Sequence, residues 1–400
     1  AGPWEGGIIN LPAVSIVDLM SLSLIRGTKE SAIVNDIIVL LKVSVVLIFI
    51  FLGWKYINEA NYVPYIPENS GKFGEFGFSG VIRAAAIVFF AYIGFDAVST
   101  AAQEAKNPKK DMPIGILGSL VICTILYILF AYVMTGVANY KSFAGQDGIA
   151  PVAHAISMMG SPDSQGVIQP DYPWLNRAIV VAILGGYSSV IMVMLMGQSR
   201  VFYSMSKDGL IPKVFSSIHP IFQTPSKNNM IFMVFVSLFA AFVPAGVVGE
   251  MTSIGTLFAF ILVCAGIWVM RVKMPEVPRS FKTPLVPLVP ILGIATCLFM
   301  MVFLPVDTWI RLIVWMLIGL DIYLSYGMKH SILNDDPGLR KGHRIVIYGG
   351  IVLSLLLIAT GFIHQNVVGW DADRTLFWVA MVLAIVHIIY YFIKLMKDKE

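Results

Sequence analysis

Residues 89–96 read FFAYIGFD, which places a glycine and an acid in the middle of an apolar run. Glycine allows a helix to unwind, and irregular backbone inside a membrane is tolerated only where it lines a cavity. The freed carbonyls and half-helix ends at such a break can hold an ammonium group, a carboxylate or a cation. The alternative interpretation is that Gly94 only allows two helices to pack closely.

The sequence around this stretch has the composition of a membrane protein. Of its 400 residues, 57% are hydrophobic and 13% are charged, whereas soluble domains have roughly 45–50% and about 25%. The small net charge of +4 gives little support to nucleic-acid binding. Cys123, Cys264 and Cys297 lie in apolar segments without a CxxC pair, so neither a disulfide nor a zinc site is predicted.

Apolar runs long enough to cross a bilayer recur along the whole chain. A transmembrane helix needs about 20 mostly apolar residues to cross roughly 30 Å of hydrocarbon. This criterion predicts an all-α polytopic protein, with residues 1–400 forming a single transmembrane domain. We expect about eleven spans, at residues 8–26, 34–54, 81–102, 113–137, 175–204, 228–246, 252–272, 284–304, 306–328, 343–363 and 374–396.

Lysine and arginine predict the orientation of these spans, because positively charged loops stay in the cytoplasm. Most of the basic residues fall on one set of alternate loops, together with the C-terminal residues Lys394, Lys397 and Lys399. The C-terminus is therefore expected in the cytoplasm. The outer connections 55–80 and 138–174 are long and rich in turn-forming residues, which predicts loops or short helices over the outer mouth.

Lys42 is the most informative charged residue inside a predicted span. Charges in hydrocarbon are costly and normally face a cavity, a partner or an ion pathway. Since burial favours the neutral form of a lysine, Lys42 is a candidate for binding and releasing a proton. Alternatively, its ammonium group extends to the cytoplasmic interface or makes a structural hydrogen bond. The run Gly185-Gly-Tyr-Ser188-Ser189 offers hydroxyls to a cation or substrate, although serines in helices often bond only the preceding turn.

Catalytic and metal-binding motifs are not found in the sequence. The histidines are scattered and form no HExxH pair, and no GxSxG elbow or phosphate-binding loop occurs. Asp18, Asp96 and Asp321 lie within predicted spans but lack the local signatures of an intramembrane acid–base pair. We therefore predict that the protein is not an enzyme and uses neither a metal nor a cofactor.

Several motifs in succession resemble the amino acid–polyamine–organocation superfamily, most closely its cationic amino acid transporter branch in bacterial form. The similarity covers roughly residues 6–330. It is carried by residues 6–14 (GGIINLPAV), the Lys42 helix, residues 89–100, 104–115 (EAKNPKKDMPIG), 197–212 (GQSRVFYSMSKDGLIP) and 255–260 (GTLFAF).

The resemblance implies a fold of two inverted five-helix repeats followed by further helices. Residues 1–60 would end the first repeat, 80–275 would form the second, and 284–400 would form the additional helices. The first span here would then correspond to the family's fourth helix and the span with residues 89–100 to its broken sixth. Three N-terminal helices, including the family's first broken helix, would be absent from this sequence.

The resemblance also implies roles for individual residues. Phe89, Phe90, Ala91, Ile93 and Gly94 would form the substrate-binding break, where backbone groups of Phe90, Ala91 and Ile93 contact the amino group and the Phe90 ring acts as a gate. Asp96 would be a proton-sensitive acid. Lys42 would occupy the place that sodium takes in sodium-coupled relatives, beside Ser188 and Ser189, so that the proton is the coupling ion.

These observations together predict a multi-pass transporter of the cell membrane that takes up an amino acid with a proton by alternating access. An amino acid exchanger and a nutrient sensor or scaffold without transport are the alternatives. The partners expected are the small-molecule substrate and the lipid bilayer. Whether the amino acid is cationic or neutral, and whether an accessory subunit exists, does not follow from the sequence.

Overall fold

The computed structural model describes residues 7–27, 31–94, 107–143, 150–164, 168–279, 281–332, 337–370 and 373–397. All eleven predicted spans contain helix within these ranges, which confirms an all-α polytopic protein. Seven helices of the described part are long and apolar enough to cross a membrane. The helices are α1 (Leu11–Arg26), α2 (Ser31–Gly53), α3 (Gly77–Ile87), α5 (Pro108–Val137), α6 (Ala150–Ser157), α7 (Pro173–Lys207), α8 (Ser226–Phe242), α9 (Ala245–Lys273), α10 (Leu288–Val302), α11 (Val306–Ile322), α12 (Met328–His330), α13 (Pro337–Val368) and α14 (Thr375–Lys397).

Proline and asparagine set several helix starts. α5 begins at Pro108 after Asn107, and α7 begins at Pro173. Proline is suited to the first helical position, since it has no backbone N–H to leave unpaired and its φ is already helical. α1 follows Asn10, whose side-chain oxygen accepts a hydrogen bond from the backbone N–H of Ala13 at 3.3 Å.

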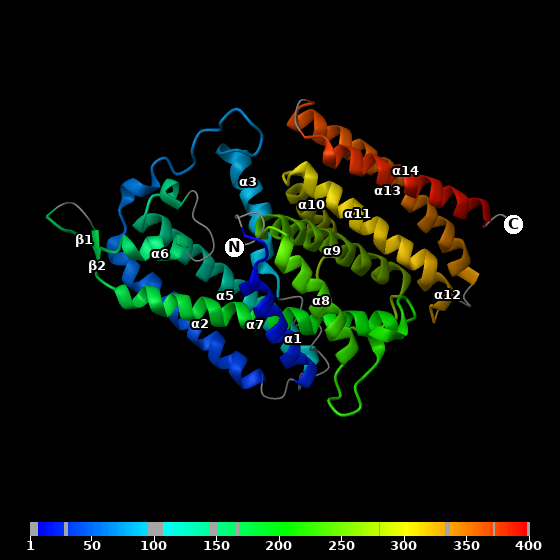
Figure 1. Ribbon diagram of the computed structural model, residues 1–400, viewed down its shortest axis with the longest axis horizontal. Helices are drawn as coiled ribbons and strands as arrows, with labels where there is room; N and C mark the ends of the chain where they lie inside the picture. The colour runs from blue at the N-terminus through cyan, green and yellow to red at the C-terminus, as the bar shows by residue number, and fades with distance from the viewer. Residues whose placement is uncertain are drawn as a thin grey trace.

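The long helix α7 is the central element of the fold. α2 and α6 pack along one part of it, and α5 packs on α2 and α6, around a core that includes Phe49, Val133 and Leu175 (Figure 1). α1 and α8 pack on each other and on α7. The hairpin of α13 and α14 packs against α11, with a core of its own around Leu317 and Leu357.

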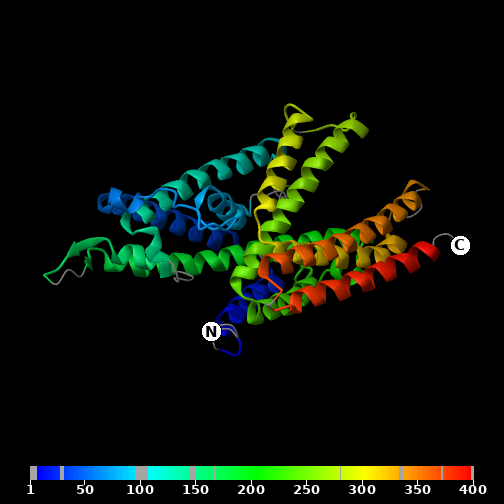
Figure 2. The ribbon, with the colours of Figure 1, turned by 90° about the horizontal axis from the view of Figure 1, so that it is seen from above.

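α9 and α10 form a neighbouring pair that runs at a steep inclination to α7 and to the α13–α14 hairpin (Figure 2). α3 and the first part of α11 also contact α9, around a core that includes Ala86, Ile254 and Leu257. This core therefore lies directly beside the C-terminal end of α3. It positions the segment that follows α3.

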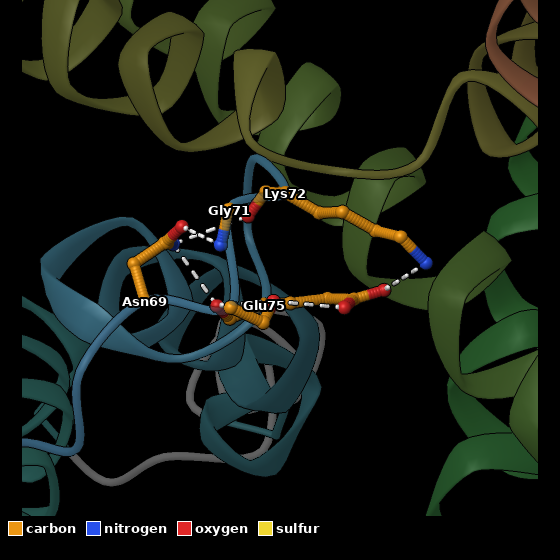
Figure 3. A network of polar contacts seen from close by, with 5 residues as sticks. Asn69, Gly71, Lys72 and Glu75 are labelled. Atoms are coloured by element: carbon orange, nitrogen blue, oxygen red, sulfur yellow. Dashed lines mark hydrogen bonds and ion pairs between the residues drawn. The ribbon is translucent and has the colours of Figure 1, made fainter.

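The turn before α3 is organised by one asparagine. The side-chain amide of Asn69 donates to the carbonyls of Lys72 at 3.1 Å and Glu75 at 2.9 Å, and its oxygen accepts from the N–H of Gly71 at 2.8 Å (Figure 3). The ammonium of Lys72 lies 3.8 Å from the Glu75 carboxylate. Gly77, the first residue of α3, has a φ of +59°, which glycine adopts without strain. These contacts fix the direction in which α3 begins.

Connections 55–80 and 138–174 contain short helices, as predicted, and one element that was not predicted. Residues 54–62 include 3₁₀ turns, and α6 lies within the second connection. The antiparallel strands β1 (Gly160–Pro162) and β2 (Ile168–Pro170) form a hairpin in the second connection. Strands of three residues are too short to produce a recognisable alternation of apolar and polar residues.

We expect Leu257→Ala to lower the free energy of unfolding by about 2 kcal/mol. This is the low end of the range for buried leucines, because helices in lipid associate without a hydrophobic driving force and the substitution costs only the lost packing contacts. Leu257 is 0% exposed in the core beside α3. The measurement is thermal unfolding of the purified protein, followed by tryptophan fluorescence. Leu262→Ala on the same helix is the control, since Leu262 is 57% exposed. Equal losses in both variants would contradict this account.

Candidate functional site

The backbone leaves α-helical geometry at the predicted break. α3 ends at Ile87, and Val88–Tyr92 form a 3₁₀ helix, η4. Ile93 is extended, with a ψ of 137°, and Gly94 has a φ of +129°, a conformation that is essentially restricted to glycine. The predicted departure from α-helix is therefore present over residues 88–94. Asp96 lies outside the described residues.

Side chains from two other helices hold the broken segment. The hydroxyl of Ser253 on α9 donates to the carbonyl of Ile87 at 2.7 Å. The phenol of Tyr127 on α5 donates to the carbonyl of Ala91 at 2.9 Å. Both bonds reach carbonyls at the transition out of the α-helix, where the usual helical partner is lost. The break is thus a defined conformation with partners of its own.

One cavity borders the break on the side of α5. Its volume is about 240 Å³. Four consecutive residues of the break form one wall and four residues of α5 the other: Ala91, Tyr92, Ile93 and Gly94 face Ser119, Leu120, Cys123 and Tyr127. Three of the five predicted substrate-binding residues, Ala91, Ile93 and Gly94, therefore line one cavity.

A second and larger cavity borders Phe90. It has a volume of about 560 Å³ and is lined by Asn10, Phe90, the end of α8 and the start of α9. Phe90 is 44% exposed, and its ring lies close to the Gly249 backbone on α9. Phe89 lines neither cavity, because its ring packs on Phe260 with centroids 5.9 Å apart. Of the two phenylalanines, Phe90 is therefore the one that lines either of these two cavities.

The side chain of Lys42, a residue of α2, lies against α7 in apolar surroundings. It lines a cavity of about 150 Å³ whose other walls are apolar, formed by Val45, Val46, Phe130, Val152, Ile179, Ala182 and Ile183. Its aliphatic stem lies against Gly186 of α7, where a Cβ atom would come within 2.7 Å of the lysine Cδ. The glycine at this position thus makes the space that the lysine occupies.

The two serines of α7 differ in their surroundings. The Ser188 hydroxyl donates to the carbonyl of Leu184 at 3.0 Å, one turn earlier in the same helix, which is the local alternative considered for this residue. Ser189 is buried, with 6% exposure. Within this stretch, Gly186 lies directly against the Lys42 stem.

α7 connects the lysine with the break. Gly186 contacts the Lys42 stem, and the Met194 methyl group lies 3.9 Å from where a Cβ on Gly94 would be. These two α7 residues are separated by about 12 Å along the helix axis, at 1.5 Å per residue. Lys42 and the predicted substrate-binding residues therefore line separate cavities, and α7 contacts both Lys42 and the break.

The other acids within predicted spans have polar partners. Asp18 of α1 accepts a hydrogen bond from the Ser237 hydroxyl of α8 at 2.6 Å, and Asp321 of α11 contacts His387 and Tyr391 of α14. In the described part of the chain, no three residues among His, Cys, Asp and Glu are grouped as a metal site would require.

Comparison with known proteins identifies the family. Residues 13–322 match the family described as "Amino acid permease". The chain belongs to this family. The break, the Lys42 cavity and the helix that connects them all lie within the matched residues, so the site described above is part of the permease domain. The family is one of transporters rather than enzymes, as predicted.

Individual relatives of this permease carry different names. A branched-chain amino acid permease of Bacillus subtilis is 43% identical over 82% of this chain and 66% of its own length. The methylthioribose transporter of Bacillus subtilis is 38% identical over 83% of this chain and 68% of its own length. A chloroplastic cationic amino acid transporter of Arabidopsis thaliana is 29% identical over 84% of this chain and 66% of its own length. The chain thus spans about two thirds of the length of these relatives.

Sequence reasoning missed two residues that hold the candidate site in place. Tyr127 and Ser253 hold the broken segment from α5 and α9, yet neither belongs to a motif that would have indicated this role. The available signal was the phenol of Tyr127 within a predicted span, since a tyrosine hydroxyl away from water usually finds a hydrogen-bond partner.

Proposed function

We propose that this permease transports an amino acid across the cell membrane by alternating access and couples the movement to a proton. The observation that carries the proposal is the break at residues 88–94, whose backbone borders two cavities. Broken helices inside membranes form the substrate sites of many secondary transporters. The proposed orientation, with the C-terminus in the cytoplasm, follows from the distribution of lysine and arginine.

The broken segment suits the amino group of a zwitterion. A backbone carbonyl has two lone pairs, so the Ala91 carbonyl that accepts from Tyr127 can accept a second hydrogen from an ammonium group. Phe90, on the side of the larger cavity, would cover the bound molecule. Phe89 has no part in this proposal, because its ring packs on Phe260.

Lys42 is the proposed site of the coupling proton. Its stem is held against Gly186 in a cavity with apolar walls. A charge in such surroundings is costly, so a lysine there can exchange its proton during a transport cycle. Because α7 contacts both Lys42 and the break, a change at the lysine can alter the position of the break. Asp96, which lies outside the described residues, remains a predicted contributor to proton coupling.

The larger cavity favours a neutral side chain on the transported amino acid. Its described lining is mostly apolar, with Asn10 and Thr252 as polar members, and no acid is among these residues. A cationic side chain leaving water would need an acidic partner. The 43% identity to a branched-chain amino acid permease supports the same preference. A cationic cargo and a sugar-like cargo are the competing proposals.

The test is uptake by the full-length protein reconstituted in proteoliposomes. Labelled leucine, arginine and methylthioribose are offered with and without an inward proton gradient. We expect leucine uptake that the inward proton gradient increases by about 5- to 150-fold, the usual range for coupling between two sites. Arginine or methylthioribose as the preferred substrate would overturn the proposed cargo.

Two further outcomes distinguish the alternative mechanisms. Uptake that requires internal amino acid and is indifferent to the proton gradient would identify an exchanger. Binding of leucine without any flux would identify a sensor or scaffold. Either result would overturn proton-coupled transport.

A further inference from the structure

A polar cluster at the interface of α11 and α14 plays no part in the proposed transport site. It consists of Asp321, His387 and Tyr391. All three residues lie inside segments that are long and apolar enough to cross a membrane, Val306–His330 and Thr375–Met396. Polar groups at such positions are costly unless they are paired, and they often mark a functional site.

The contacts within the cluster are specific. The Tyr391 hydroxyl donates to Oδ1 of Asp321 at 2.8 Å, and Nε2 of His387 lies 3.0 Å from Oδ2 of the same carboxyl group. The other ring nitrogen, Nδ1 of His387, lies 2.7 Å from the carbonyl of Leu383. Tyr391 is fully buried. Every nitrogen and oxygen of the Asp321 and His387 side chains therefore has a partner.

The hydrogens required by these contacts determine how many protons the Asp321 and His387 side chains carry. A carbonyl oxygen can only accept, so the short contact with Leu383 requires a hydrogen on Nδ1 of His387. The contact between Nε2 and Asp321 then requires a hydrogen as well, since a bare nitrogen and an ionised carboxylate would repel each other at 3.0 Å. That hydrogen is either on Nε2 or on the carboxyl group.

We propose that Asp321 and His387 form a proton-binding site that holds one shared proton within the membrane, separate from Lys42. The pair carries one proton more than a neutral histidine beside a carboxylate. Its net charge is zero in both arrangements, imidazolium with carboxylate or imidazole with carboxylic acid. A neutral pair is the state that a medium of low dielectric constant favours.

The surrounding helices are shaped to hold this site. A Cβ atom on Gly350 of α13 would come within 2.4 Å of Cζ of Tyr391, so the glycine makes room for the tyrosine ring. The ring is thereby directed at Asp321. Immediately after α11, residues Tyr323–Gly327 form a π-helical turn, η7. Such turns occur frequently at functional sites.

The test is the protonation of His387 in the full-length protein in lipid at neutral pH. Solid-state NMR of protein labelled with ¹⁵N-histidine reports which ring nitrogens carry hydrogen, and ¹³C labelling of aspartate reports whether Asp321 is ionised. His387→Gln and Asp321→Asn identify the signals by their loss. We expect either both ring nitrogens protonated beside an ionised Asp321, or hydrogen on Nδ1 alone beside a protonated Asp321.

Two results would overturn the proposal. One is hydrogen on Nε2 alone with a bare Nδ1, and the other is a neutral His387 beside an ionised Asp321. Either would mean that the cluster is only a polar link between two helices. Because this readout needs no transport, its failure is distinct from failure of the proposed uptake.

Asp321→Asn also tests the shared proton directly. An asparagine can accept from Tyr391 through its oxygen and donate to Nε2 of His387 through its amide, so it replaces both contacts without a proton. We expect His387 in this variant to be neutral, with hydrogen on Nδ1 only. Asp307→Asn on the same helix is the control and should leave the His387 signals unchanged, because Asp307 pairs with Arg311 instead. A doubly protonated His387 in Asp321→Asn would contradict the proposal.

Discussion

Lys42→Met is expected to reduce proton-driven amino acid uptake by about 5- to 150-fold, the range that corresponds to coupling free energies of 1–3 kcal/mol. Methionine has an unbranched side chain of similar length, so it can occupy the space against Gly186 and keep the apolar walls of the cavity packed. It cannot bind a proton. The residual uptake should therefore no longer respond to the proton gradient.

The measurement is initial uptake in proteoliposomes at several external pH values, together with thermal unfolding to show that the variant is folded. Lys55→Met is the matched control, because Lys55 lies just beyond the same helix and is exposed. Its uptake should equal that of the unmodified protein. Unchanged uptake and pH response in Lys42→Met would remove Lys42 from the coupling mechanism.

Gly94→Val is expected to raise the KM for uptake by about 5- to 150-fold. Gly94 has a φ of +129°, and holding a residue other than glycine in such a conformation costs about 1–3 kcal/mol. A β-branched side chain adds further restriction. The break would then be populated less often in its binding-competent shape, which lowers the apparent affinity by the same factor.

Substrate binding and uptake by the reconstituted variant measure this effect. Gly115→Ala is the control, since Gly115 lies within α5 with open space around its Cβ position and no positive φ. Alanine is favoured over glycine inside a helix, so this variant should transport normally. If Gly94→Val bound and transported like the unmodified protein, the conformation of the break would be irrelevant to function.

The positions of the helices could be predicted from the sequence because apolar length alone decides what can cross a bilayer. The break could be predicted because glycine and an acid interrupt an apolar run at residues 89–96. The extent of the break could not be predicted. The sequence predicts one span over 81–102, whereas the α-helix ends at Ile87 and a 3₁₀ helix follows.

Side-chain direction limited the prediction of the site. Phe89 and Phe90 are adjacent and chemically identical, yet one packs in a core and the other lines a cavity. Likewise, Ser188 bonds its own helix while Gly186, two residues earlier, contacts Lys42. Such differences depend on the rotation of a helix against its neighbours, and an apolar span with little amphipathic pattern does not reveal that rotation. The apolar pattern of the sequence thus locates the site only to within about one helical turn.

The length of α7 has a mechanical consequence. Its 35 residues extend about 52 Å, well beyond the roughly 30 Å of bilayer hydrocarbon. The contacts with Lys42 and Gly94 are near its middle, at Gly186 and Met194. If α7 tilts about this middle, its two ends swing in opposite directions while the contacts at the pivot move little. Tilting of α7 as a rigid helix would thus open the protein toward one side of the membrane while closing it toward the other.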